Sequence, residues 1–464
     1  FGGVSPSTGS FTLGANEYNN LVSTFINLSN VAASFRLDIS AGTYAGTPFS
    51  SMTLANLFGI ESTMYHRTRS GKLGLVYYVP NQQYVLAAVN NNIQTAVDYA
   101  AVGDVINVQA GTYAQTVTIN KSVEVRGPNY LVSPNGGARV PEAIITGGIS
   151  VDNAASKTVI IEGFRFQGVT SPMVYNGGAP GTIVADLTFR KNMVDNSSGQ
   201  LAVDLGTATN SALVLLDDNN FAGMAGNAIQ LNGGVGVLNA TVTNNSITGT
   251  GFAGINTNGI SASTFDGNTI SNTGQQGIQV AGTASNVTIS NNVITNANTS
   301  NAADRGGIRL RGGSLTGFVN ITNNIISGSN NGIALPAPDD ITGKTINVNN
   351  NNLSGNTVSI NHFGSGNLAA TCNWYGTANL ATVATRVAGA VTYQPLLTSG
   401  TDTDVAIGFQ PGGGTCQTVS AIVVNGTATD DDCAVAVNGS IDITVTGGVA
   451  PFTYAWDNSA VTED

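Results

Sequence analysis

The sequence predicts an all-β solenoid in which short strands form coils that stack along one axis. Seven times an asparagine stands two residues before an apolar residue, at steps of 23 to 32 residues. A period in this range is typical of stacked repeats. The asparagines are Asn192, Asn219, Asn245, Asn268, Asn292, Asn324 and Asn351. Their apolar partners are Val194, Phe221, Ile247, Ile270, Ile294, Ile326 and Leu353.

The residues before each asparagine indicate a strand with one face inward. Positions five and three residues earlier are mostly apolar, as in Val287 and Ile289, and a period of two places such residues on one face. A polar stretch after the asparagine leads to Gly-Ile pairs such as 277–278. Asn and Gly tolerate the left-handed backbone of tight bends. One coil cannot bury its own apolar face, so we expect stacked coils with the asparagines aligned as a ladder.

Both ends of the repeat region carry recognisable sequence motifs. Residues 93–100 have helical apolar spacing and Gly103 ends the run. The phrase Asn-Trp-Tyr-Gly-Thr at 373–377 stands near the other end. Together with the ladder, these phrases resemble right-handed parallel β-helix proteins of the pectin-lyase-like superfamily, over roughly 90–398. The resemblance implies that the helix caps the open core. It also implies that Trp374 and Tyr375 pack to close the rod.

The chain before the β-helix, residues 1–88, is predicted to be an N-terminal capping or first-coil region. Its phrase Ala-Gly-Thr-Tyr at 41–44 occurs again at 110–113. Apolar residues within 18–30 suggest a short amphipathic helix, and Met64–Tyr78 suggests a hairpin-like insertion. The β-helix itself is assigned to 89–398.

The residue pattern of the chain changes after Leu397. Residues 399–415 are polar and end in Pro-Gly-Gly-Gly, which predicts a linker. Within 416–464, the phrase from Gly447 to Trp456 resembles the repeat named after the SprB gliding-motility adhesin, an immunoglobulin-like β-sandwich of secreted surface proteins. Some 50 residues are too few for a two-sheet core. We therefore expect an incomplete repeat, with further repeats and a secretion or anchoring signal in a longer parent protein.

The composition limits which binding partners and which cellular compartment are plausible for the protein. Charged residues make up 9% of the 464 residues and the net charge is −11, so the basic footprint of nucleic-acid binding is missing. No run of 18 apolar residues is present, so no membrane insertion is expected. Abundant Asn, Gly, Thr and Ser favour a secreted or cell-surface protein. Cys372, Cys416 and Cys433 do not have metal-site spacing. A Cys416–Cys433 disulfide is one possible pairing, with one thiol left over.

The strongest candidate ligand site is the cluster Asp304, Arg305, Arg309 and Arg311. It follows the longest step of the repeat, so a loop should bulge from the rod there. On a strand, Arg309 and Arg311 share one face, expected to be the outer one, and could bind a sugar carboxylate bidentately. The alternative is a solvated loop in which Asp304 pairs with an arginine.

Other polar groups indicate turns more than chemistry. In the pairs Asp217-Asp218 and Asp339-Asp340, adjacent side chains on a strand would point to opposite faces, so the two carboxylates of a pair would not converge. Aspartate is also a common residue in turns. His66 and His362 lie in no base–nucleophile pattern. The run 430–432, three aspartates, could ligate Ca²⁺, or it could be a hydrated turn. The sequence therefore predicts no catalytic residue, no metal centre and no obligatory cofactor.

These observations favour a non-catalytic, secreted, adhesin-like protein whose rigid rod presents binding loops to glycans or other surface proteins. Self-association is a further possibility. One alternative is a polysaccharide lyase or glycoside hydrolase whose carboxylates converge across coils. Another is a filament or surface-layer subunit.

Overall fold

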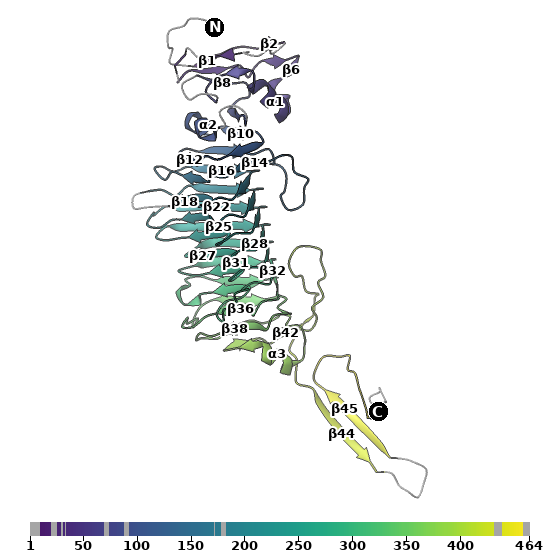
Figure 1. Cartoon of the computed structure of the whole chain (residues 1–464). Helices are drawn as coiled ribbons and strands as arrows, with labels where there is room; N and C mark the ends of the chain where they lie inside the picture. Colours follow the sequence, from purple (N-terminus) through teal and green to yellow (C-terminus); the bar gives the residue numbers. More distant parts are fainter. Residues whose placement is uncertain are drawn as a thin grey trace.

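The computed structural model describes residues 10–19, 26–28, 31–32, 34–68, 74–87, 92–170, 172–177, 182–430 and 439–457. The chain forms an elongated rod of stacked coils, with a small unit at the N-terminal end and a hairpin beyond the C-terminal end (Figure 1). Three parallel sheets run along the rod, and each coil contributes one strand to a sheet.

Sheet 1 has thirteen strands in chain order, and it includes every strand that precedes a ladder asparagine. They are β9 (Gln82–Val85), β10 (Val105–Val108), β13 (Val123–Arg126), β16 (Thr158–Glu162), β19 (Asp186–Arg190), β22 (Ser211–Asp217), β25 (Val237–Thr243), β28 (Ser261–Asp266), β31 (Ser285–Ser290), β34 (Val319–Thr322), β37 (Ile346–Asn349), β39 (Leu368–Ala369) and β41 (Val391–Thr392).

Sheets 2 and 3 complete each coil. Sheet 2 consists of β11 (Gly111–Tyr113), β14 (Ala143–Ile145), β17 (Arg165–Gln167), β20 (Met193–Asp195), β23 (Asn220–Ala222), β26 (Ser246–Thr248), β29 (Thr269–Ser271), β32 (Val293–Thr295) and β35 (Ile325–Ser327). Sheet 3 consists of β12 (Val117–Ile119), β15 (Ile149–Val151), β18 (Val174–Gly177), β21 (Leu201–Asp204), β24 (Ile229–Asn232), β27 (Ile255–Asn258), β30 (Ile278–Val280), β33 (Ile308–Leu310), β36 (Asn331–Leu335), β38 (Val358–His362) and β40 (Val387–Ala388).

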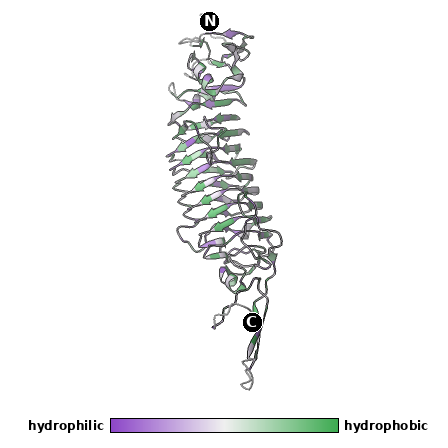
Figure 2. Ribbon diagram, turned by 90° about the vertical axis from the view of Figure 1, so that its right-hand side faces the viewer, coloured by the Kyte–Doolittle hydropathy of each residue, from purple (hydrophilic) through white to green (hydrophobic). Residues whose placement is uncertain are grey.

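Equivalent apolar residues form continuous columns inside the rod. Ile270 pairs in register with Ile294, and Ile294 pairs with Ile326. All three side chains are fully buried. Figure 2 shows hydrophobic residues recurring on the stacked strands, coil after coil. The predicted stacking is therefore confirmed, and one contiguous core of Val, Ile, Leu and Phe fills the rod.

The asparagines form a hydrogen-bonded ladder at the bend between sheets 1 and 2. The side-chain oxygen of Asn268 accepts two hydrogen bonds from Asn245: one from its backbone N–H at 3.0 Å and one from its side-chain amide at 2.9 Å. The Asn268 amide donates to Asn292 and to the carbonyl of Val242, both at 2.9 Å. Asn373 extends the ladder by one rung. The residue before each rung, from Lys191 to Cys372, has a left-handed backbone with φ of 53° to 64°.

Short helices close both ends of this core. Helix α2 (Ile93–Tyr99) begins at Asn92, whose side chain accepts the N–H of Thr95 at 3.1 Å, and its apolar face is buried in the core. The helix predicted over 93–100 is thus confirmed, and its apolar side chains cover this end of the rod core. Helix α3 (Leu380–Arg386) lies at the other end. Tyr375 is fully buried there, but the prediction for Trp374 is wrong: it is half-buried outside the core, because the residue after a ladder asparagine points outward.

The N-terminal unit is a set of extra coils with a core of its own. Its strands are β1 (Ser10–Thr12), β2 (Glu17–Tyr18), β3 (Ile26–Asn27), β4 (Arg36–Asp38), β5 (Thr43–Tyr44), β6 (Thr47–Pro48), β7 (Met64–Tyr65) and β8 (Leu75–Tyr77), and it contains η1 (Phe49–Ser51) and helix α1 (Leu54–Glu61). A second 3-10 turn, η2 (Gly312–Ser314), follows β33 in the rod.

One expectation for this unit lies mostly outside the described residues, and another is wrong. Of the span 18–30, where a short helix was predicted, residues 20–25 and 29–30 are not described; Tyr18 ends β2 and Ile26 begins β3. The span 64–78 is not a hairpin, because β7 pairs parallel with β3 and β8 pairs parallel with β4. The two strands therefore join separate parallel sheets and do not pair with each other.

Residues 399–415 were predicted to be a linker. In the structure, residues 398–415 form a strap that lies along the rod. Strands β42 (Leu396–Leu397) and β43 (Cys416–Gln417) pair antiparallel at its base. Phe409 is fully buried, and its N–H and carbonyl both bond to Asn323, at 2.8 and 2.9 Å. Beyond the strap, β44 (Val423–Thr429) and β45 (Ser440–Thr446) form an exposed antiparallel hairpin.

The possible Cys416–Cys433 pairing is contradicted by the structure. Cys416 is bonded to Cys372, with a Cα–Cα distance of 5.1 Å. The β42–β43 pair brings Cys416 beside the last ladder bend, where Cys372 precedes Asn373. Cys433 lies outside the described residues.

Replacing a middle rung should destabilise the rod far more than replacing an exposed asparagine. Asn268→Ala leaves buried donors and acceptors on both neighbouring coils without partners, which should cost about 3 kcal/mol or more. The measurement is urea unfolding followed by circular dichroism. Asn347→Ala is the matched control, because Asn347 is exposed on β37. Equal losses in the two variants would contradict the ladder.

Mapping of unreduced peptides by mass spectrometry should recover Cys372 linked to Cys416. Closing 44 residues of chain should contribute about 4 kcal/mol in the chain-entropy description. Cys372→Ser should therefore lower the melting temperature and speed proteolysis within 398–415. Recovery of Cys416 linked to Cys433 would refute this arrangement.

Candidate functional site

The outer face of sheet 3 carries a strip of side-chain amides that bond one another across coils. The Asn256 amide donates to Gln230 at 2.7 Å, and the Gln279 amide donates to Asn256 at 2.6 Å. Arg309 donates to Gln279 at 2.7 Å and ends the strip. These residues occupy equivalent outward positions on β24, β27, β30 and β33. The strip therefore follows from strict register and from polar residues at one outward position.

Arg309 points outward, as predicted, because its neighbours Ile308 and Leu310 are fully buried in the core. Its guanidinium bonds the Asp304 carboxylate at 2.5 Å and the Asp304 carbonyl at 3.1 Å. Only 8% of Arg309 is exposed. Burial lowers the pKa of Arg309 while the Asp304 carboxylate acts to raise it, and guanidinium remains charged at neutral pH. Arg309 therefore anchors the loop and aligns the strip.

Arg305 and Arg311 are more accessible. Arg305 donates to Gln276 at 2.9 Å and also to Gln275. Arg311 follows β33 and pairs with Asp339 at 3.1 Å, while 41% of its side chain remains exposed. The structure thus brings all four predicted residues together, and the alternative pairing of Asp304 with an arginine is present within the cluster.

A cavity of about 530 Å³ lies on the sheet 2 side of the same loop. Asparagine, serine, threonine and glycine residues dominate its lining, including Asn272, Asn296, Asn301 and Asn330. Side-chain amides can both donate and accept hydrogen bonds. The cavity and the strip together offer a polar surface on both sides of the loop.

The aspartate pairs serve the fold. Asp217 accepts from Thr243 at 2.7 Å and from Asn244 at 3.0 Å. Asp218 occupies a left-handed ladder bend and accepts from Ser133 at 2.6 Å, which holds the loop 127–142 against the rod. The Asp340 side chain accepts the backbone N–H of Thr342 at 2.9 Å. Each pair is thus engaged in a bend or a loop anchor.

Both histidines are buried and bonded. His66 lies 2.8 Å from Glu61, and His362 lies 2.9 Å from the carbonyl of Gly366. Of the aspartate run, Asp430 is exposed and 431–432 fall outside the described residues. In the ranges described, no cluster of three or more His, Cys, Asp and Glu side chains could hold a metal ion.

Sequence reasoning missed one ionic cluster on the outer face of sheet 1. Glu162 is 1% exposed and bonds Arg126 at 3.0 Å and Arg190 at 2.5 Å. Arg126 also bonds Glu124 and lies over the Tyr130 ring. Burial acts to raise the pKa of Glu162, but its hydrogen bonds and the two arginines lower the pKa overall. Opposite charges at one outward position of successive coils were the available signal.

No helix in the described part of the chain combines the length and hydropathy that a bilayer crossing requires. The sequence matches no curated protein. Among solved structures, the chain is similar to the A-module of mannuronan C-5 epimerase AlgE4 from Azotobacter vinelandii, with 14% identity and a TM-score of 0.32. That similarity spans 66% of this chain and 95% of the epimerase module.

Two polysaccharide lyases are similar at the same level. The PL6 family alginate lyase AlyGC has 14% identity and a TM-score of 0.36, over 74% of this chain and 54% of the lyase. A mannuronic acid specific family 6 lyase from human gut microbiota has 10% identity and a TM-score of 0.29, over 68% and 91%. Similarity at this level carries no conclusion about the fold or the activity of this chain.

Two family descriptions match separate parts of the chain. Residues 147–353 match the right-handed beta helix region, which corresponds to the ladder coils. Residues 425–461 match the SprB repeat, which includes the β44–β45 hairpin. The chain therefore folds as a parallel β-helix whose ladder coils match the right-handed beta helix region, followed by a segment that matches the SprB repeat.

Proposed function

We propose that the protein is a secreted, adhesin-like surface protein whose rod binds acidic glycans without cleaving them. The observation that carries this proposal is the amide strip of sheet 3, which ends on Arg309, with Arg305 and Arg311 in the same cluster. A SprB repeat and a β-helix fit a surface protein. A stiff rod suits recognition because its stacked core holds the outward side chains at fixed spacing.

The chemistry of the strip selects the ligand class. Neighbouring coils of a parallel sheet lie about 4.8 Å apart, so the strip presents evenly spaced donors and acceptors along its length. Amides bond sugar hydroxyls, and arginine bonds carboxylates with charge-assisted geometry. Arg305 and Arg311 keep 26% and 41% of their side chains exposed although each pairs with an aspartate, whereas only 10% of the Arg309 side chain is exposed. An extended polyuronate lying along the strip satisfies this arrangement.

The absence of cleavage is part of the proposal. The aspartates that the sequence singled out, Asp217, Asp218 and Asp339, are held by hydrogen bonds or an ion pair within the rod. General acid–base catalysis needs a group placed to exchange a proton with substrate. The carboxylates beside the strip instead hold arginines.

Arg305→Ala and Arg311→Ala should each weaken binding of a polyuronate by about 10-fold or more, because each removes a charged hydrogen-bonding group. Isothermal titration at low ionic strength measures the effect, and added salt should weaken wild-type binding. Arg165→Ala is the matched control: Arg165 lies on the outer face of sheet 2, paired with Asp195 at 2.6 Å. It should bind as the wild type does.

The same polyuronate should keep its length during incubation, with and without Ca²⁺, as judged by size-exclusion chromatography. Chain shortening that requires Arg309 or Asp217 would replace this proposal with the lyase or hydrolase alternative. Equal binding by the wild type and both sheet 3 variants would reject the strip as the binding surface.

A further inference from the structure

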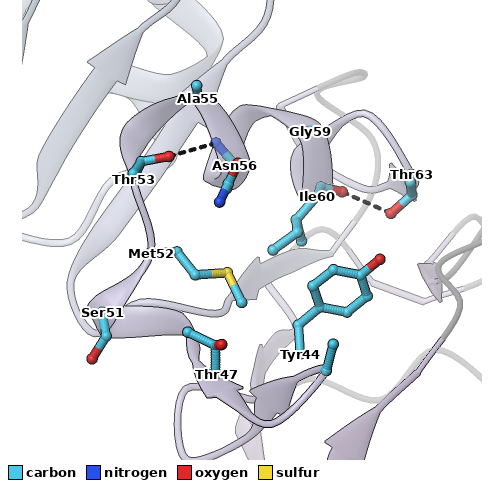
Figure 3. A pocket seen from close by; sticks show the side chains of 11 residues that line it. Tyr44, Thr47, Ser51, Met52, Thr53, Ala55, Asn56, Gly59, Ile60 and Thr63 are labelled. Atoms are coloured by element: carbon cyan, nitrogen blue, oxygen red, sulfur yellow. Dashed lines mark hydrogen bonds between the residues drawn. The ribbon is translucent and has the colours of Figure 1, made fainter.

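The N-terminal unit contains a cavity that is lined by its own residues. Its volume is about 540 Å³, within the range of roughly 300–1,000 Å³ that small-molecule sites occupy. It lies between helix α1 and the β5–β6 pair (Figure 3). The cavity therefore belongs to the extra coils, far along the chain from Arg305 and Arg309.

The cavity has an apolar floor and a polar rim. Figure 3 shows the side chains of Tyr44, Met52 and Ile60 converging on its centre. Asn56 and Thr63 stand at the rim. Such a lining fits a ligand that has an apolar face and several hydroxyl groups.

The rim keeps hydrogen-bonding capacity free. The Thr53 hydroxyl accepts the N–H of Asn56 at 3.3 Å, so its own proton is available to a ligand. The Thr63 hydroxyl donates to the Ile60 carbonyl at 2.7 Å, so its lone pairs can accept. The exposed Asn56 side-chain amide bonds no other described residue and can do both.

Gly59 keeps the cavity open at the expense of the helix. It lies inside α1, where glycine is unfavourable relative to alanine. A Cβ added at Gly59 would meet no atom within 4 Å, and its backbone conformation does not require glycine. Gly59 lines the cavity, so a large side chain at this position would project into it.

The described residues of the lining carry no charge. Among them, Tyr44 is the one with an ionisable side chain. Glu61, the acidic residue of α1, is fully buried elsewhere and accepts from His66 at 2.8 Å, Thr68 at 2.5 Å and Tyr78 at 3.1 Å. No described residue of the lining offers a charged ligand an opposite charge.

We propose that this cavity binds one uncharged sugar residue. The apolar face of the ring packs on Tyr44, Met52 and Ile60, and its hydroxyls bond Thr53, Asn56 and Thr63. The site is independent of the acidic-glycan surface on sheet 3, since no residue is common to both. A glycan with neutral and uronic residues would engage the two sites separately.

The test uses the full chain and saturation-transfer NMR with methyl glucoside, methyl galactoside, methyl mannoside and glucuronate as probes. At least one neutral glycoside should show saturable binding. Gly59→Phe should weaken that binding at least 10-fold by filling the cavity, and Asn56→Ala should weaken it several-fold from an exposed position. Gly59→Ala is the matched control, which should bind nearly as the wild type does and melt at a higher temperature.

Binding of a neutral glycoside that Gly59→Phe and Asn56→Ala leave unchanged would overturn the proposal. So would the absence of saturable binding of every neutral probe, or preferential binding of glucuronate. Arg305→Ala should leave neutral-glycoside binding intact, so failure of the cavity site and failure of the sheet 3 site are distinguishable.

Discussion

The hydrogen-bonded column of buried asparagines is the constraint on which the architecture depends. Each rung ties a backbone N–H and a side-chain amide of one coil to the side chain of the next. A one-residue slip would remove the asparagine from its position in the bend and turn the inward face of the strand outward. The ladder thereby fixes the register of sheets 1 and 2, and the core columns and outward columns follow from it. It runs from Asn192 to Asn373.

Because the register is fixed, residues at equivalent positions of successive coils lie next to one another on the surface of the rod. Gln230, Asn256, Gln279 and Arg309 lie 23 to 30 residues apart in sequence, yet they form one strip because their coils are stacked. The same rule produces the cluster of Arg126, Glu162 and Arg190 on sheet 1, where the charges satisfy one another. The two surfaces differ in the side chains that occupy equivalent positions, while the backbone beneath them is the same.

Local patterns predicted the ladder, the core columns and the capping helix, because each depends on spacing within one or two coils. They also placed Arg309 on the outer face. Contacts between distant segments could not be predicted this way. The burial of Phe409 and the Cys372–Cys416 bridge arise because the strap returns along the rod, and polar composition alone suggested a linker. The N-terminal cavity was missed because its lining comes from short elements with no periodic signal.

Engineered disulfides test the register most directly. Thr264 and Thr288 are register partners on the outer face of sheet 1, and coils about 4.8 Å apart lie within the Cα separation that a disulfide spans. The pair Thr264→Cys and Thr288→Cys should form a bridge readily, as detected by peptide mapping. The pair Thr264→Cys and Asn320→Cys, two coils apart, should not. Bridging in the second pair but not in the first would contradict the stacked-coil account.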